Sequence, residues 1–112
     1  MKTFPNDIAQ QLRKRAAHEQ RLRQTWEESP DNEEIRNQVR EVDKTNTIFL
    51  KEVVSRYGWP KISEVGEEAA EAAWLIAQHT PDKSFLKECL ELMQASPSEV
   101  KSQNLARTID RV

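Results

Sequence analysis

Residues 57–82 read YGWPKISEVGEEAAEAAWLIAQHTPD, and this stretch contains both glycines of the 112-residue chain. Gly58 is suited to ending a preceding helix, because glycine tolerates a positive φ angle. The Trp-Pro pair that follows requires extended or turn backbone, since a residue before proline is disfavoured in the helical region. Ser63 is then a good N-cap for a helix that runs to about His79. Small residues along one stripe of this helix would let neighbouring backbones approach closely, so we expect it to be central.

The rest of the chain carries apolar residues at three- and four-residue steps, which is the period of an amphipathic helix. Ser-Pro and Thr-Pro pairs separate the segments that follow this period. The expected helices besides the central one are residues 5–28, 31–57, 82–95 and a last helix that Ser96 or Ser98 caps. No segment alternates apolar and polar residues as a half-buried strand would. We therefore predict one all-α domain over residues 1–112, a bundle of about five helices that begins with a long helical hairpin.

The apolar stripes identify residues expected in the core. Cys89 lies on the apolar face of the helix over residues 82–95, which predicts an inert buried thiol. Because it is the single cysteine, the chain has no internal disulfide. The inward face of the last helix is expected to carry Val100, Leu105, Ile109 and Val112.

Charge and composition limit the partners of the chain. The 19 acidic and 17 basic residues give a net charge of -2, so no global field favours nucleic acid or an anionic membrane. The basic residues from Arg13 to Arg23 are interpreted as a solvated helix face, with phosphate contacts as the weaker alternative. No apolar run is long enough for a membrane helix, and the N-terminus lacks the apolar core of a signal peptide. We expect a cytoplasmic protein, with neither nucleic acid nor a membrane among its partners.

Two pairs of polar residues resist a purely structural interpretation. Asp43 and Asn46 are one turn apart on the apolar face of their predicted helix. Such a pair can set the register of two helices or lie at an exposed edge, and alternatively it can line a pocket. Near the C-terminus, in the pair Asp110-Arg111, Arg111 could bind an inner carboxylate or an anionic ligand, or it could form a surface ion pair that contributes little.

His79 is expected at the end of the central helix, after Gln78 and before the sequence Thr-Pro-Asp. A histidine there interacts favourably with the negative end of the helix dipole, so it can be no more than a C-terminal cap. In the functional alternative, His79 is a general acid or base that Asp43 or Asp82 orients. Gln78 would then add hydrogen-bonding support, while Asp82 is also placed to cap the following helix.

Metal and cofactor sites find little support in the sequence. One cysteine and two distant histidines, His18 and His79, do not supply the three or four ligands of a zinc site. A carboxylate-rich metal site with Asp43 and Asp82 is a weaker alternative. The chain has no glycine-rich phosphate loop and no nucleophile elbow. We therefore expect neither a metal nor a cofactor.

The motifs of the C-terminal two thirds resemble those of a bacterial family of unknown function, the DUF6624 family. The resemblance rests on Asp43-x-x-Asn46, Gly58-Trp59-Pro60, Trp74-Leu75-Ile76-x-Gln78-His79-x-x-Asp82 and Asp110-Arg111-Val112. It covers about residues 39–112 as a family-like core, with residues 1–30 as a variable first helix. It implies no established activity, and it implies a Gln- and Tyr-Gly-containing tail after the Asp-Arg-Val segment. The site residues that it implies are Asp43, Asn46, Trp59, Gln78, His79, Asp82, Asp110 and Arg111.

Two functions fit these residues. The first is a binding or interaction module with a polar pocket around His79, which takes an unknown protein partner or a small polar ligand. The amphipathic hairpin is also compatible with a homodimer through the seam of the first helix. The alternative is a small enzyme with hydrolase-like acid/base chemistry, in which His79 works with Asp43 or Asp82. The ligand-binding residues would be Asn46, Trp59, Trp74, Gln78, Asp110 and Arg111.

Overall fold

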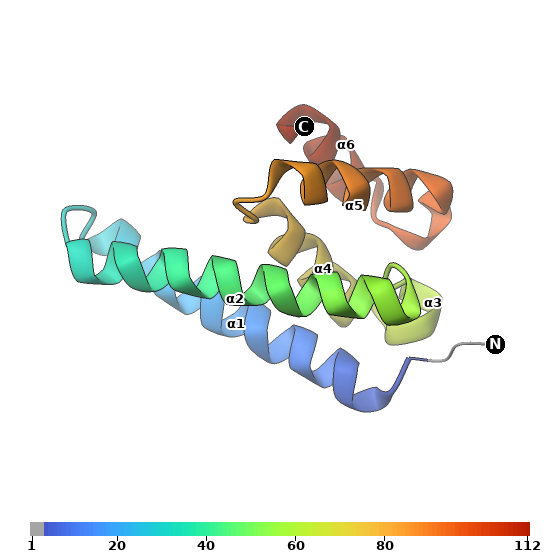
Figure 1. Ribbon diagram of the computed structural model, residues 1–112, viewed down its shortest axis with the longest axis horizontal. Coiled ribbons are helices and arrows are strands. Elements are labelled where there is room, and N and C mark those ends of the chain that lie inside the picture. Colours follow the sequence, from blue (N-terminus) through green and yellow to red (C-terminus); the bar gives the residue numbers. More distant parts are fainter. Residues whose placement is uncertain (1–3) are drawn as a thin grey trace.

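Two long antiparallel helices run along one side of the molecule, and the shorter helices pack against one half of them (Figure 1). The computed structural model describes residues 4–112 of the chain. Its helices are α1 (Asn6–Glu28), α2 (Glu33–Tyr57), α3 (Ile62–Val65), α4 (Glu67–Gln78), α5 (Lys83–Ala95), the 3-10 helix η1 (Pro97–Glu99) and α6 (Ser102–Arg111). Over these residues the structure contains no strand, which confirms the predicted all-α domain.

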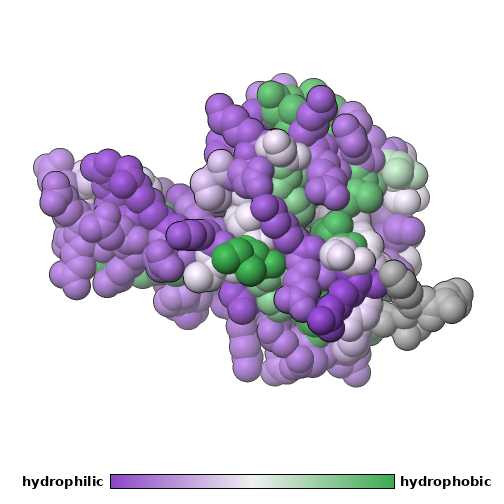
Figure 2. Space-filling view, viewed as in Figure 1, coloured by the Kyte–Doolittle hydropathy of each residue, from purple (hydrophilic) through white to green (hydrophobic). Residues whose placement is uncertain are grey.

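The predicted hairpin is formed by α1 and α2, which contain 23 and 25 residues. Asn32 caps α2, because its side-chain Oδ1 accepts a hydrogen bond from the N–H of Ile35 at 3.2 Å. The closed end of the hairpin projects beyond the other helices (Figure 1), and its visible surface is almost entirely hydrophilic (Figure 2). The apolar contacts between the hairpin and the other helices therefore lie toward its open end.

The helix α4 is central, as its small residues predict. Ala69, Ala73 and Ala77 are fully buried, and α4 packs against α1, α2, α5 and α6. Single-carbon side chains allow this close approach on several sides. On α5, Cys89 is buried as expected, and burial raises the pKa of its thiol to about 12. The thiol is therefore protonated and unreactive at neutral pH.

The central helix is shorter than predicted, because Gly66 interrupts it. Gly66 has a φ of 89° and a ψ of 163°, a conformation that residues with a side chain rarely adopt. As a result α3 ends at Val65 and α4 begins at Glu67. The prediction that Ser63 caps one long helix is wrong. Ser63 lies inside α3, and its backbone N–H donates to Glu99 Oε2 at 2.7 Å.

The last helix packs with its polar side inward, contrary to the expectation from its apolar stripe. Asn104 and Thr108 are buried, whereas Ile109 and Val112 are 50% and 55% exposed. The cause lies on α4, where Trp74 Nε1 donates to the backbone oxygen of Asn104 at 3.1 Å and to Thr108 Oγ1 at 3.0 Å. A buried indole N–H requires such an acceptor, and α6 provides it.

The start of α6 also differs from the prediction. Neither Ser96 nor Ser98 caps it, because Ser96 precedes η1, Ser98 lies within η1, and α6 begins later without a side-chain cap. Val100 and Leu105 are partly buried against the core, as expected. None of the helices in the described part of the chain is long and apolar enough to cross a membrane.

Replacing Gly66 with alanine tests the helix break. A Cβ at this position would meet no atom within 4 Å, so the backbone conformation rather than a clash opposes the substitution. We expect Gly66→Ala to lower the free energy of unfolding by about 1–3 kcal/mol, measured by urea denaturation. Glu64→Ala, at an exposed position of the neighbouring α3, is the control and should change it little. Unchanged or raised stability of Gly66→Ala would show that the chain tolerates a continuous helix here.

Candidate functional site

A layer of polar side chains interrupts the apolar packing between α1, α2 and the end of α4. Steps of three or four residues place its members on the inner faces of the two long helices. The structure brings together three of the predicted site residues, Asp43 and Asn46 from α2 and His79 from the end of α4. The members of this polar layer are Arg15, Glu19 and Arg23 on α1, Asp43 and Asn46 on α2, and His79 directly after α4.

Glu19 is the most deeply buried charged residue of the polar layer, with 1% of its side chain exposed. Its Oε2 lies 3.2 Å from His79 Nδ1, so the two form an ion pair when the imidazole is protonated. The geometry is not that of a hydrogen bond, and within residues 4–112 neither Glu19 oxygen has a hydrogen-bond donor. Burial of a carboxylate costs free energy unless another charge compensates it. His79 Nδ1 faces this carboxylate, and it supplies the compensating charge when the ring is protonated.

The turn after α4 holds His79 in position. The His79 backbone N–H lies within hydrogen-bond distance of carbonyl groups in the last turn of α4. The next residue, Thr80, is buried, and its Oγ1 lies 2.8 Å from Thr47 Oγ1 on α2. His79 has 27% of its side chain exposed while Nδ1 is buried. The exposed edge of the ring is therefore the one that carries Nε2.

Arg23 and Asp43 form a second ion pair of the layer, with Arg23 Nη2 2.5 Å from Asp43 Oδ2. Both side chains are largely buried. Burial raises the pKa of the Asp43 carboxyl, while the charge and the hydrogen bond of Arg23 act to lower it. The negative charge of Glu19 raises the same pKa, and the charge of His79 lowers it. The four charges therefore influence one another across α1, α2 and the end of α4.

Arg15 extends the polar layer toward the open end of the hairpin. Its Nη1 donates to Asn46 Oδ1 at 3.1 Å, and its guanidinium carbon lies 4.2 Å from the centre of the Phe49 ring. Asn46 is buried, and burial lowers the pKa of Arg15. Because this hydrogen bond joins α1 to α2, it helps to fix the register of the hairpin.

A surface hollow of about 540 Å³ opens beside the polar layer, between α1 and the end of α4. Most of the side chains in this polar hollow are hydrogen-bond donors, and Glu27 is the one carboxylate that lines it. A ligand here would meet guanidinium, amide and imidazole groups together. The lining residues are Gln20, Arg21, Arg23, Gln24, Glu27, Leu75 and His79.

Asp82, predicted to orient His79, is engaged elsewhere. Its Oδ1 accepts a hydrogen bond from the N–H of Phe85 at 3.0 Å, so it caps α5. Its Oδ2 lies 2.5 Å from Lys51 Nζ. The hydrogen bond from Lys51, followed by that from Phe85, lowers the pKa of Asp82. Asp82 therefore caps α5, which is the other role that the sequence predicted for it.

The other predicted ligand-binding residues lie away from the polar hollow. Trp74 Nε1 and Gln78 Nε2 both donate to one threonine hydroxyl on α6, at 3.0 Å and 2.7 Å. Trp59 is buried in the hydrophobic core. Asp110 and Arg111 are exposed at the end of α6, and they take part in no ion pair within the described chain. None of these five residues lines the polar hollow.

Glu19, Arg21 and Arg23 are site residues that the sequence analysis missed. Positions 19 and 23 continue the three- and four-residue steps of the first apolar stripe, so charged residues there signal a buried polar layer. The interpretation of the basic cluster as a solvated face holds for the exposed Arg13 and Arg21. It is wrong for Arg23, which is largely buried in its ion pair. Arg21 carries no such signal in the sequence.

The polar layer consists of oppositely charged side chains that pair with one another, and it does not form a set of metal ligands. Among the described residues, no three His, Cys, Asp or Glu side chains are grouped so that they could hold a metal ion. A buried carboxylate beside an accessible imidazole suits proton exchange or the recognition of an anion. The fold and the site thus define a small all-α protein with a buried polar layer beside an open polar hollow.

A family model places the chain among known sequences. The model described as a family of unknown function (DUF6624) matches residues 6–112, and the chain belongs to this family. The match includes α1, and with it Glu19 and Arg23, so it extends beyond the residues that carried the resemblance. No match was found among curated proteins or among solved structures.

The pairing of Glu19 with His79 predicts that their substitutions are not additive. His79→Ala removes the imidazole that faces the buried carboxylate, and it should lower the free energy of unfolding by about 3 kcal/mol. Glu19→Gln removes the charge and keeps the size, so His79→Ala in that background should cost only about 1 kcal/mol. Urea denaturation of the four proteins measures the difference. His18→Ala, at an exposed position of α1, is the control. An equal cost of His79→Ala in both backgrounds would contradict the pairing.

Proposed function

We propose that the chain is a binding protein that takes a small anionic ligand in the polar hollow beside His79. The observation that carries this proposal is the buried Glu19, whose Oε2 lies 3.2 Å from His79 Nδ1, so that the Nε2 edge of the ring is the one at the hollow. When the ring is protonated, its Nε2–H can donate to an anion. A ring that is already held in place loses little further freedom on binding, which favours affinity.

Two arginines supply positive charge to the same hollow. Arg21 lines it and has no ion-pair partner within residues 4–112. Arg23 lines it as well, although its Nη2 is engaged with Asp43. A guanidinium group can hold two oxygens of a carboxylate or phosphate at once. With Glu27 as the one opposing carboxylate, the charges of the hollow favour an anion.

A second candidate is acid/base catalysis by His79, with Glu19 in the place that was predicted for Asp43 or Asp82. A carboxylate beside Nδ1 leaves Nε2 free to exchange a proton with a substrate. The lining of the polar hollow includes no serine, threonine or cysteine, so water would be the nucleophile and would give its proton to Nε2. Turnover of a bound carboxylic ester that disappears in His79→Gln would favour this candidate over binding alone.

An interaction role concerns other surfaces of the molecule. Ile109 and Val112 on and after α6 are exposed apolar residues, and a contact with another protein would be sought there. A protein partner, a homodimer and a cytoplasmic location stay predictions from the sequence.

Titration with inorganic phosphate and with acetate, followed by NMR of the His79 and Arg21 side chains, tests the proposed function. We expect saturable shifts with a dissociation constant of about 1 mM, since a few charge-assisted hydrogen bonds supply about 4 kcal/mol. Arg21→Gln removes one charge and should weaken binding about tenfold. Arg107→Gln makes the same change at an exposed position of α6 and should leave binding unchanged. If neither anion shifts these signals saturably, the proposed function is wrong.

A further inference from the structure

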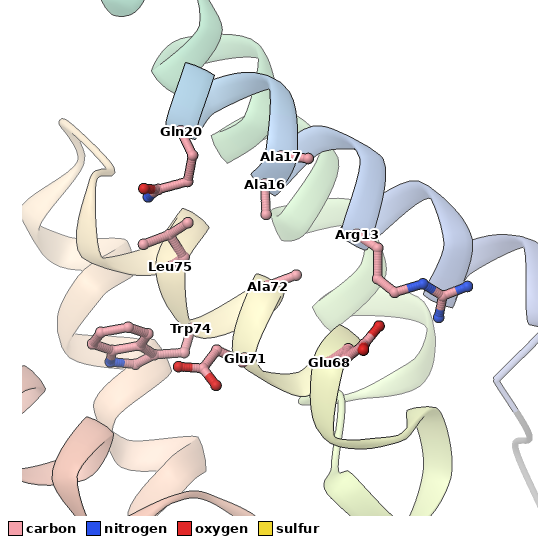
Figure 3. A pocket seen from close by; sticks show the side chains of 9 residues that line it. All are labelled: Arg13, Ala16, Ala17, Gln20, Glu68, Glu71, Ala72, Trp74 and Leu75. Carbon is pink, nitrogen blue, oxygen red and sulfur yellow. The ribbon is translucent and has the colours of Figure 1, made fainter. Parts of the chain in front are cut away.

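A second hollow lies next to the polar hollow, between α1 and α4. This second hollow has a volume of about 610 Å³ and shares Gln20 and Leu75 with the first. Figure 3 shows these two residues at one end of it, with Arg13 and Glu68 at the other. The two hollows are therefore neighbours along the seam between the helices, and together we call them the α1/α4 groove.

The middle of the α1/α4 groove is apolar because small side chains line it. Ala16 and Ala17 on α1 and Ala72 on α4 contribute single methyl groups, and larger side chains would fill the same space. Glu71 also belongs to the lining, but it points away from α1 (Figure 3) and forms an ion pair with Lys101. The charge of Glu71 is therefore compensated, and it does not oppose an apolar ligand.

We infer that the ligand is an amphiphilic monocarboxylate, with its carboxylate beside His79 and Arg21 and a medium-length alkyl chain along the α1/α4 groove. This inference rests on the proposed function and names the class of ligand. The charges set the orientation, because the polar hollow carries an excess of cations while the far end carries both signs, Arg13 and Glu68. That polar end also limits the length of the chain that the groove can cover.

The size and charge of the α1/α4 groove favour a free acid over a lipid surface. Each hollow falls within the range of about 300–1,000 Å³ that is usual for small-molecule sites. The net charge of -2 and the glutamates at the rim of the groove disfavour an anionic membrane. A small acid needs only one cationic end and a short apolar wall, and the groove offers both.

A series of acetate, butanoate, hexanoate and octanoate, titrated into the full chain, tests this inference. Complete burial of a methylene raises affinity about fourfold, and the groove is open to solvent, so we expect about two- to fourfold per methylene. The gain should end at the length that reaches Arg13 and Glu68. NMR signals of Ala17 and Ala72 should shift with hexanoate and octanoate but not with acetate.

A variant whose groove is filled by a larger side chain tests the position of the alkyl chain. Ala17 is exposed on α1 and leucine is a good helix former, so Ala17→Leu should fold normally while occupying the apolar wall. It should abolish the gain with chain length and leave the affinity for acetate unchanged. Ala106→Leu makes the same change at an exposed position of α6 and should retain the gain.

The outcomes separate this inference from the proposed function. Binding of acetate without any gain for longer acids would overturn the inference and leave the proposed function standing. Failure of phosphate and of every acid to bind would overturn both, and binding of phosphate alone would overturn only the inference. A gain that persists in Ala17→Leu would place the alkyl chain elsewhere, and a dimer whose interface covers Ala17 would put a second copy in the groove. Either of these last two results overturns the inference.

Discussion

The burial of one carboxylate constrains how the helices meet. Glu19 has 1% of its side chain exposed, and a charge removed from water to this degree costs several kcal/mol unless another charge lies close. His79 Nδ1 lies 3.2 Å from Glu19 Oε2, and it compensates this charge when the ring is protonated. The end of α4 must therefore lie against α1 at the level of Glu19. The ion pair of Arg23 with Asp43 joins α2 to the same layer, so three helices are positioned by mutually compensating charges.

The position of α4 then determines which of its side chains face α1 and which face α6. Toward α1 it presents alanines and, at its end, His79, which leaves the α1/α4 groove open beside an imidazole. Toward α6 it presents Trp74 and Gln78, whose N–H groups bind the buried polar side of that helix. Gly66 allows this division, because its positive φ ends α3 and lets α4 follow a direction of its own. Trp74 belongs to both sides, because its ring also lines the α1/α4 groove (Figure 3).

The sequence predicts the helical class and the hairpin well, because helix period, Ser-Pro breaks and small residues are local signals. It does not predict the break at Gly66, since a glycine inside a helical pattern is compatible with either a helix or a turn. The face of α6 that packs inward depends on the indole N–H of Trp74. This donor lies 30 residues before its acceptor Asn104 in the sequence. In the polar layer, Asn46 was predicted because it interrupts an apolar stripe that Asp43 borders, and His79 because it follows the end of a helix. Glu19 was missed because a glutamate on a helix is ordinarily exposed, and only its place in the apolar stripe reveals otherwise.

Long-range proton–nitrogen NMR of the two histidine side chains measures most directly whether Glu19 holds His79. We predict that the neutral His79 ring carries its proton on Nδ1, toward the carboxylate, and leaves Nε2 as the accessible atom of the polar hollow. His18, exposed on α1, serves as the reference within the same molecule, and Glu19→Leu should remove the preference. A proton on Nε2 in the native chain, unaffected by Glu19→Leu, would show that the buried carboxylate does not orient the ring.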